Sequence, residues 1–399
     1  MNANLKHLHP YPFERLNQLK GGIVPPAHLS HIALSIGEPK HPSPEFVKQV
    51  MRDSVDKLAQ YPTTKGGLEL RQSIASWLTR RFKLDAVDAE QQVLPVTGTR
   101  EALFAFTQAV INNDAESPVV VSPNPFYQIY EGAAILAGAE PYYLDCIPEQ
   151  GFIPDLSSVP ESVWQRCQLL QICTPGNPTG AVMSIAQMQE AIALADKYDF
   201  IIASDECYSE VYFDEQTPPF GLLEACQQMG RNNYDRCVVF HSLSKRSNLP
   251  GLRSGFIAGD AAILKDFLSY RTYHGCAMSL PVQEASIAAW DDEQHVIDNR
   301  TLYRKKFALV TGILRDVLTF PEPQASFYLW PETPIDDRDF AQGLFAQQNV
   351  TLLPGQYLSR ESATGNPGSY RVRMALVAPT EECVEAAMRI KQYVQSLGK

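Results

Sequence analysis

The sequence lacks the features that mark several large classes of protein. Its eight cysteines include no C-x-x-C pair and no clustered spacing, so neither a disulfide framework nor a zinc motif is predicted. No apolar run is long enough to cross a membrane. The first residues, MNANLKHLHPYPFERL, contain no apolar core of a secretory signal. These absences predict a chain that works in a reducing compartment, the cytoplasm, and does not enter a membrane.

Positive charge is also scarce. The chain has 34 Lys and Arg against 45 Asp and Glu, a net charge of −11, and no basic run. A footprint for nucleic acid or for an anionic membrane is therefore not predicted. The histidines near the start are scattered without a second group of ligands, so no metal site is predicted: they are His7, His9, His28, His31 and His41.

What the sequence does contain is an alternation of strand-like and helical segments from residue 93 onward. Short apolar runs such as VVVS, QLLQIC, FIIAS and CVVF are separated by helical spacing, for example over 185–198. This pattern predicts an α/β fold whose mostly parallel sheet is covered by helices on both faces. Further helical stretches are predicted over 68–82 and, as one long region, over 281–317.

The two ends of the chain differ from its middle. Residues 1–44 form a proline- and histidine-rich arm that ends in a short strand, and the region after about 295 has the alternating segments ASFYLW, VTLLPG and YRVRMAL before a last helix. At 399 residues the chain can bury more than one core. We predict a large domain over 45–290 and a small α+β domain from 1–44 and 291–399.

The stretch CVVFHSLSKRSNLPGLRSG, residues 237–255, carries the clearest chemistry. A buried strand is followed by Ser242, Ser244 and Lys245, and Arg253 comes eight positions later. A lysine at a buried strand end loses hydration, which lowers its pKa and makes the amine a nucleophile toward aldehydes. An arginine beside it can hold a phosphate. An aldehyde and a phosphate in one small molecule point to pyridoxal phosphate.

Two other strand ends carry groups that suit the same molecule. Gly98, Thr99 and Arg100 lie between a strand and a helix, where unpaired N–H groups and the helix dipole favour a phosphate. Any strand–glycine–helix junction has this form, so the signal is weak alone. Tyr127 follows the run VVVS, and its ring can either stack on a pyridine ring or pack in the core.

The remaining candidates are an amide, a carboxylate and two arginines. Asn177, in the turn TPGNPTG, can bond a phenolate oxygen or a carboxylate. Asp205 follows the apolar strand FIIAS, where a buried carboxylate needs a partner such as a pyridinium N–H; a helix N-cap is the alternative. Tyr208 can bond a ring oxygen. Arg371 and Arg373 share one face of an alternating strand and together form a carboxylate receptor, with an ion pair as the alternative for Arg371.

These motifs, in this order along the chain, resemble those of the class I/II aminotransferases, the fold-type I enzymes that use pyridoxal 5′-phosphate. The resemblance implies that Lys245 bonds covalently to the cofactor and moves the substrate α-proton. Arg373, in R-M-A, would bind the α-carboxylate with help from the Gly37 N–H and Asn177. The catalytic residues would be Lys245, Asp205 and Tyr208. The cofactor-binding residues would be Tyr61, Gly98, Thr99, Arg100, Tyr127, Asn177, Asp205, Tyr208, Ser242, Ser244, Lys245 and Arg253. It also implies a homodimer with shared active sites, in which Tyr61 reaches the neighbour's phosphate.

Longer stretches resemble the proteobacterial succinyldiaminopimelate aminotransferases: PYPFERL, SIGEPKHP, YPTTKGG, LPVTGTREALFAF and SPNPFYQIYEGAAILAGAEPYY. This resemblance implies ping-pong transfer from glutamate to N-succinyl-2-amino-6-oxopimelate, in lysine and diaminopimelate biosynthesis. That acceptor carries several carboxylates, so further cations are needed, and Lys40, Arg100 and Arg271 are the candidates.

Other activities on the same fold keep the same core motifs. An aspartate or aromatic aminotransferase, or a C–S lyase, would retain Lys245 and Asp205. A regulator that binds the cofactor without turnover needs an added basic DNA-binding domain. The acidic net charge and the start of the motif pattern by Gly37 both argue against that class.

Overall fold

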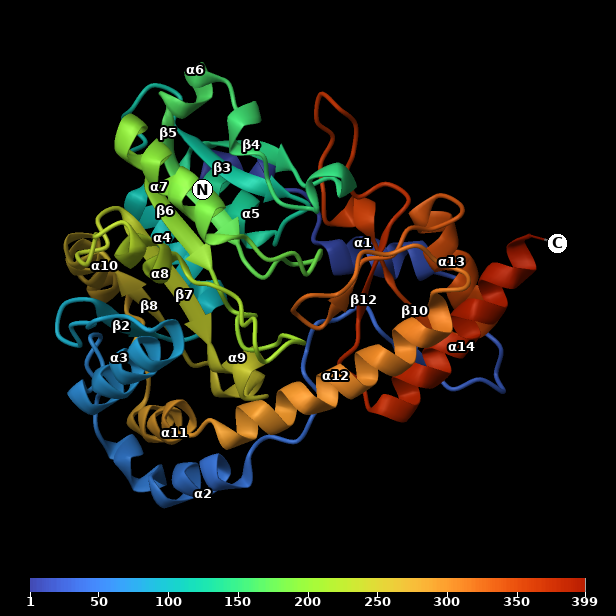
Figure 1. Ribbon diagram of the computed structural model, residues 1–399, viewed down its shortest axis with the longest axis horizontal. Helices are drawn as coiled ribbons and strands as arrows, with labels where there is room; N and C mark the ends of the chain where they lie inside the picture. Colours follow the sequence, from blue (N-terminus) through green and yellow to red (C-terminus); the bar gives the residue numbers. More distant parts are fainter. Residues whose placement is uncertain (399) are drawn as a thin grey trace.

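The computed structural model describes residues 1–398. Its largest sheet has seven strands and lies in the left half of Figure 1. The strand order is β2-β8-β7-β6-β5-β3-β4. Pairs that involve β8 are antiparallel, and the other neighbouring pairs are parallel. The predicted mostly parallel α/β sheet is thus confirmed. Its strands are β2 (Val93–Val96), β3 (Val119–Asn124), β4 (Glu140–Asp145), β5 (Cys167–Cys173), β6 (Ile201–Asp205), β7 (Cys237–Ser242) and β8 (Gly255–Gly259).

Helices cover both faces of this sheet, so its strands bury alternate side chains in two separate cores. In β8, Phe256 packs into the core beneath one face and Ile257 into the core beneath the other. The first core is closed by α3 (Leu68–Phe82), α7 (Ile185–Tyr198), α8 (Leu222–Gln228) and α11 (Leu280–Asp291). The second is closed by α4 (Thr99–Val110), α5 (Ile129–Ala137) and α10 (Ala261–His274). Burial on both faces explains why the central strands are rich in apolar residues, whereas the edge strand β4, EPYYLD, is only partly buried.

A second group of elements joins the two ends of the chain. β1 (Ile32–Ala33) pairs in parallel with β10 (Val350–Thr351), and Ile32 faces Val350. A three-stranded antiparallel sheet has the order β11-β12-β9. Its strands are β9 (Tyr328–Leu329), β11 (Leu353–Pro354) and β12 (Val372–Ala375), and its helices are α12 (Gln294–Leu314), α13 (Asp337–Gln348) and α14 (Thr380–Leu397). The domain limits 44/45 and 290/291 stay a prediction.

The helix predicted over 281–317 is in fact two helices. α11 ends at Asp291 and α12 begins at Gln294, and α12 runs from the side of the large sheet toward α14 (Figure 1). The remaining helices are α1 (Pro12–Lys20), α2 (Glu45–Asp53), α6 (Glu161–Trp164) and α9 (Leu243–Arg246). Within residues 1–398, none of the helices combines the length and the apolar character needed to cross a bilayer.

Because β8 runs antiparallel to β7, the residues that connect these two strands lie at one edge of the sheet. β7 ends at Ser242 and β8 begins at Gly255, paired with it in register. The connection, residues 243–254, therefore starts and finishes at the edge where β5 and β6 also end. Ligands of open α/β sheets bind at this carboxyl-terminal edge.

Gly259, at the opposite end of β8, tests how closely β8 packs against β7. Its φ is +140°, and a Cβ there would lie 2.1 Å from the carbonyl oxygen of Cys237. We expect Gly259→Ala to lower the free energy of unfolding by about 2 kcal/mol, because both the clash and the backbone conformation penalise the methyl group. Urea unfolding followed by tryptophan fluorescence measures the change.

Gly312→Ala is the matched control. Gly312 lies in the exposed face of α12, and a methyl group added there would have no other atom within 4 Å. Alanine at this position should therefore stabilise the helix by roughly 0.5 kcal/mol or more. An unfolding midpoint for Gly259→Ala equal to that of the unmodified chain would contradict the clash at β8.

Candidate active site

A cavity of about 400 Å³ opens at the carboxyl-terminal edge of the large sheet. Its walls come from strand ends, from the N-terminal arm and from the three-stranded sheet. The structure brings most of the predicted site residues together here: Gly37, Thr99, Arg100, Tyr127, Asn177, Asp205, Tyr208, Ser242, Ser244, Lys245, Arg253 and Arg373 all line it.

Lys245 lies in α9, immediately after β7, and its Nζ donates a hydrogen bond to the carbonyl oxygen of Gly37 at 2.6 Å. Burial lowers the pKa of Lys245 to about 8, and the nearby charges of Arg373 and Arg253 act in the same direction. Roughly one tenth of the amine is therefore uncharged at pH 7, and about half at pH 8, far more than for an exposed lysine. The uncharged amine is the form that attacks an aldehyde.

Asp205 ends β6 with only 4% of its surface exposed. Its Oδ2 accepts a hydrogen bond from the Tyr130 hydroxyl at 2.7 Å, and its Oδ1 accepts one from the Cys207 N–H at 3.3 Å. Both donors are neutral, and burial raises the pKa of the carboxyl group. A buried carboxylate that faces a cavity without a cationic partner fits the protonated nitrogen of a pyridine ring.

A cradle for an anion lies at the N-terminus of α4. Gly98 is its N-cap, with a φ of +93°, and a Cβ at this position would lie 2.1 Å from Nη2 of Arg253. Only glycine allows the guanidinium so close to the helix end. Ser242 and Ser244 line the same cavity, so hydroxyl groups, a fixed cation and a helix dipole converge as a phosphate requires.

Arg373 is the second cation of the cavity. It donates from Nη1 to Oδ1 of Asn177 at 3.0 Å and from Nη2 to the Ser35 carbonyl at 2.7 Å. Its buried Nε has no hydrogen-bond partner within residues 1–398. Both bonds go to neutral acceptors, so the positive charge remains available to a substrate carboxylate.

Arg371 does not join Arg373, and the prediction of a paired receptor is wrong. Its guanidinium contacts the Trp330 carbonyl at 3.3 Å and the Glu332 carboxylate at 3.5 Å. Arg371 still continues the register of β12, because it pairs with Glu332 as Met374 pairs with Leu329. Its guanidinium is nevertheless held by these two neighbours, the Trp330 carbonyl and the Glu332 carboxylate, and does not line the cavity, so the ion-pair alternative holds.

Tyr328, in β9, is a cavity residue that the sequence did not reveal. Its hydroxyl lies 3.0 Å from the hydroxyl of Tyr208, and the Arg373 guanidinium lies 4.5 Å above its ring. A Cβ on Gly37 would come within 2.0 Å of the Tyr328 hydroxyl. Tyr328 thus contacts both Tyr208, the predicted donor to the ring oxygen, and Arg373, the cation predicted to bind the substrate carboxylate. Nothing local marks it, since β9 approaches the cavity only by pairing with β12.

The N-terminal arm supplies another wall that the sequence did not reveal. Arg100 donates from Nε to the Tyr127 hydroxyl at 2.6 Å and from Nη2 to the Tyr11 hydroxyl at 2.9 Å. Phe13 lines the cavity beside them. Burial raises the pKa of Tyr127 strongly, so its hydroxyl stays neutral and leaves the charge of Arg100 uncompensated.

Three predicted residues lie elsewhere. Lys40 is exposed and does not line the cavity. Arg271 is buried and donates to the Glu101 carboxylate at 2.7 Å, so the hypothesis that these two cations bind substrate is wrong. Tyr61 is fully exposed on the surface of this chain. Its role toward the phosphate of a neighbouring subunit stays a prediction.

A family model, aminotransferase class I and II, matches residues 30–390. The chain belongs to the class I and II aminotransferases. This family depends on pyridoxal phosphate, and the predicted family, fold and cofactor are confirmed.

Relatives of this aminotransferase have been described and solved. An LL-diaminopimelate aminotransferase from Nitratidesulfovibrio vulgaris is 31% identical over 97% of each chain. The crystal structure of an aminotransferase from Neisseria meningitidis is 51% identical, covers 100% of both chains and has a TM-score of 0.95. A probable N-succinyldiaminopimelate aminotransferase from Thermus thermophilus is 27% identical, with a TM-score of 0.83, over 96% of this chain and 100% of the other.

The low pKa of Lys245 has a measurable consequence. In the cofactor-free aminotransferase, the rate of covalent bond formation with added pyridoxal phosphate should rise about tenfold per pH unit and level off near pH 8. The rise follows the uncharged fraction of the amine. Stopped-flow absorbance measures the rate, and Lys245→Arg is the control that should form no bond. A rate still rising at pH 10 would contradict the burial argument.

Tyr328 can be tested with two variants. Tyr328→Ala removes the ring beneath Arg373, which should raise the KM for glutamate about tenfold because a desolvated cation–π contact is lost. Tyr328→Phe keeps the ring and should change this KM by no more than about twofold. Steady-state kinetics measures both values, and an equal increase in the two variants would show that the ring does not support Arg373.

Proposed function

We propose that this aminotransferase moves the amino group of glutamate to N-succinyl-2-amino-6-oxopimelate, a reversible step of diaminopimelate and lysine biosynthesis. One observation carries the proposal: Arg373 and Arg100 line the same cavity, and neither has a carboxylate partner within residues 1–398. Two uncompensated cations suit a substrate with separated carboxylates, because each cation then gains an opposite charge.

The relatives support a diaminopimelate-type substrate and leave a second candidate. The Thermus thermophilus protein is named for the succinylated compound, whereas curated relatives such as those from Nitratidesulfovibrio vulgaris and Syntrophobacter fumaroxidans, at 31% and 32% identity, are named for LL-diaminopimelate itself. Both compounds combine an amino group with a distant carboxylate. The alternative function is therefore an amino transfer that forms LL-diaminopimelate itself, without a succinyl group on the substrate.

The reaction would divide among the residues of the cavity. Bound pyridoxal phosphate supplies an aldehyde for the amino group and a ring that withdraws electrons from the substrate Cα. Arg373 binds the α-carboxylate and fixes the orientation of the Cα–H bond. The amine of Lys245 would accept the proton from the substrate Cα and return a proton to the carbon two bonds away, on the other side of the nitrogen. Asp205 holds the proton on the ring nitrogen.

The other end of the cavity would fix the cofactor. The phosphate would be held by Arg253, the N-terminus of α4, Ser242 and Ser244, and Tyr208 would donate a hydrogen bond to the ring oxygen. Tyr127 would offer its aromatic ring for stacking. We further propose a homodimer with shared sites, in which the exposed Tyr61 reaches the neighbouring phosphate.

Paired donor substrates test the proposal. With 2-oxoglutarate as acceptor, N-succinyl-LL-diaminopimelate should give a kcat/KM at least about tenfold above that of LL-diaminopimelate, aspartate or tyrosine. Glutamate formation measures each rate. A preference for LL-diaminopimelate would select the alternative substrate, and a preference for aspartate or tyrosine would overturn the diaminopimelate assignment while leaving the family intact.

Arg100→Ala provides the matched variant. Removing this cation should raise the KM for the succinylated donor about tenfold and the KM for glutamate less. Lys40→Ala, which changes an exposed cation outside the cavity, should leave both values unchanged. Equal increases for both donors in Arg100→Ala would show that Arg100 does not recognise the distal carboxylates.

A further inference from the structure

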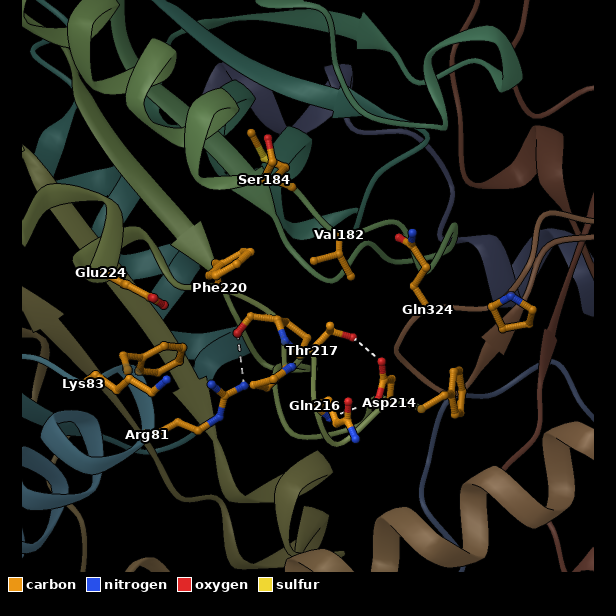
Figure 2. Close-up of a pocket in the computed structure, with 16 residues that line it drawn as sticks. Arg81, Lys83, Val182, Ser184, Asp214, Gln216, Thr217, Phe220, Glu224 and Gln324 are labelled. Atoms are coloured by element: carbon orange, nitrogen blue, oxygen red, sulfur yellow. Dashed lines mark hydrogen bonds between the residues drawn. The ribbon is translucent and has the colours of Figure 1, made fainter. Parts of the chain in front are cut away.

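A second cavity, of about 640 Å³, lies apart from the lysine cavity and shares no lining residue with it. Figure 2 shows it between the end of α3, the loop 213–220 and the segment 182–184. Pro323 and Gln324, which lead into β9, close it from the side of the three-stranded sheet. Its volume is in the range of small-molecule sites in proteins.

The walls of this second cavity are mostly apolar. Phe213 and Phe220 contribute rings, and 42% of the Phe220 surface is exposed although the residue lies beside buried Leu222. Further apolar contact comes from Phe82, Val182, Met183, Pro218, Pro219 and Pro323. A concave apolar surface with a few polar groups is the usual form of a ligand site, because it can remove the body of a ligand from water.

Two side chains of opposite charge lie at one end of the cavity. Figure 2 shows Glu224 and Lys83 on the same side, far from Gln324. No ion pair joins either side chain to another within residues 1–398. Burial raises the pKa of Glu224, and the charges of Arg81 and Lys83 lower it, so the carboxylate lies within electrostatic range of both. A half-buried carboxylate without a paired cation is costly unless a ligand supplies one.

The third charge at this end, Arg81, is already neutralised. It donates from Nε to the Glu210 carboxylate at 2.5 Å and from Nη2 to the Ser209 and Pro219 carbonyls, each at 3.1 Å. Arg81 therefore lines the cavity, but its charge is already paired and is not available to bind a ligand. Asp214 also lines the cavity, but its carboxylate already accepts hydrogen bonds from the Gln216 N–H and the Thr217 hydroxyl of its own loop. Within residues 1–398 the charged side chains left for a ligand are Glu224 and Lys83.

We propose that this cavity is a second binding site, separate from the active site, for a free α-amino acid with an apolar side chain. The ammonium of the ligand pairs with Glu224 and its carboxylate pairs with Lys83. The side chain of the ligand lies against Phe213, Phe220 and the prolines. A zwitterion is the ligand class because it satisfies both unpaired charges, whereas an amine or a carboxylic acid would leave one of them without a partner.

The site borders segments that lead to the active site. Ser209 and Glu210, which Arg81 binds, directly follow Tyr208. The Phe213 N–H donates to the Gln324 carbonyl at 3.3 Å, and the Ser326 N–H donates to the Val211 carbonyl at 2.6 Å. A ligand that packs against Phe213 and Gln324 therefore touches both segments of the protein that carry the hydroxyl pair, one with Tyr208 and one with Tyr328.

Calorimetric titration with L-phenylalanine tests the proposal. The holoenzyme is first aminated with excess glutamate and desalted, so that no aldehyde remains to react with the added amino acid. We expect saturable binding of about one equivalent per chain. 2-Phenylethylamine and 3-phenylpropanoate, which each lack one charge, should bind about tenfold more weakly or worse.

Variants separate this site from the active site. Glu224→Gln and Lys83→Met should each weaken L-phenylalanine binding about tenfold, and Lys83 is exposed, so its substitution leaves the core intact. Glu190→Gln, an exposed carboxylate on α7, and Arg373→Ala should leave it unchanged. Absence of saturable binding, or binding that Arg373→Ala abolishes and the two cavity variants retain, would overturn the proposal. Neither result depends on the diaminopimelate assignment.

Discussion

The active site depends on withdrawing one ammonium group from water. Lys245 keeps a single strong contact, to the Gly37 carbonyl at 2.6 Å, and burial shifts its pKa to about 8. That contact joins the edge of the large sheet to the N-terminal arm. Gly37 in turn has room only for a hydrogen atom beside the Tyr328 hydroxyl. The position of Lys245 therefore depends on the arm and on the three-stranded sheet, because both shield its amine from solvent.

Residues whose role is set by local chain pattern were predictable from the sequence. Lys245 and Asp205 directly follow buried strands, and parallel strands deliver their carboxyl ends to one edge. Tyr328 and Tyr11 were not predictable, because they reach the cavity through contacts between distant segments. Arg371 shows a different limit. Strand alternation predicts which face a side chain starts from, but the end of a long side chain is placed by its partners, and for Arg371 these are the Trp330 carbonyl and the Glu332 carboxylate.

The two cavity arginines differ in how firmly they are held. Arg373 is fixed by Asn177, by the Ser35 carbonyl and by the ring of Tyr328, which suits a group common to every amino acid. Arg100 is held by two phenol hydroxyls, one of them on the arm. Phenols are weak, neutral partners that a carboxylate can displace. A cation held in this way is suited to bind a part of the substrate that varies, because the guanidinium of Arg100 can change position at little cost.

The antiparallel return of β8 places the cofactor-binding groups on one sheet and the substrate-binding Arg373 on another. Lys245 and Arg253 both belong to the short connection between two paired strands of one sheet, so the span between the amine and the phosphate cradle is set within a single rigid element. Arg373 belongs to a different sheet, the one ordered β11-β12-β9. Any slide of one sheet past the other thus changes the grip on the substrate while the anchorage of the cofactor is preserved.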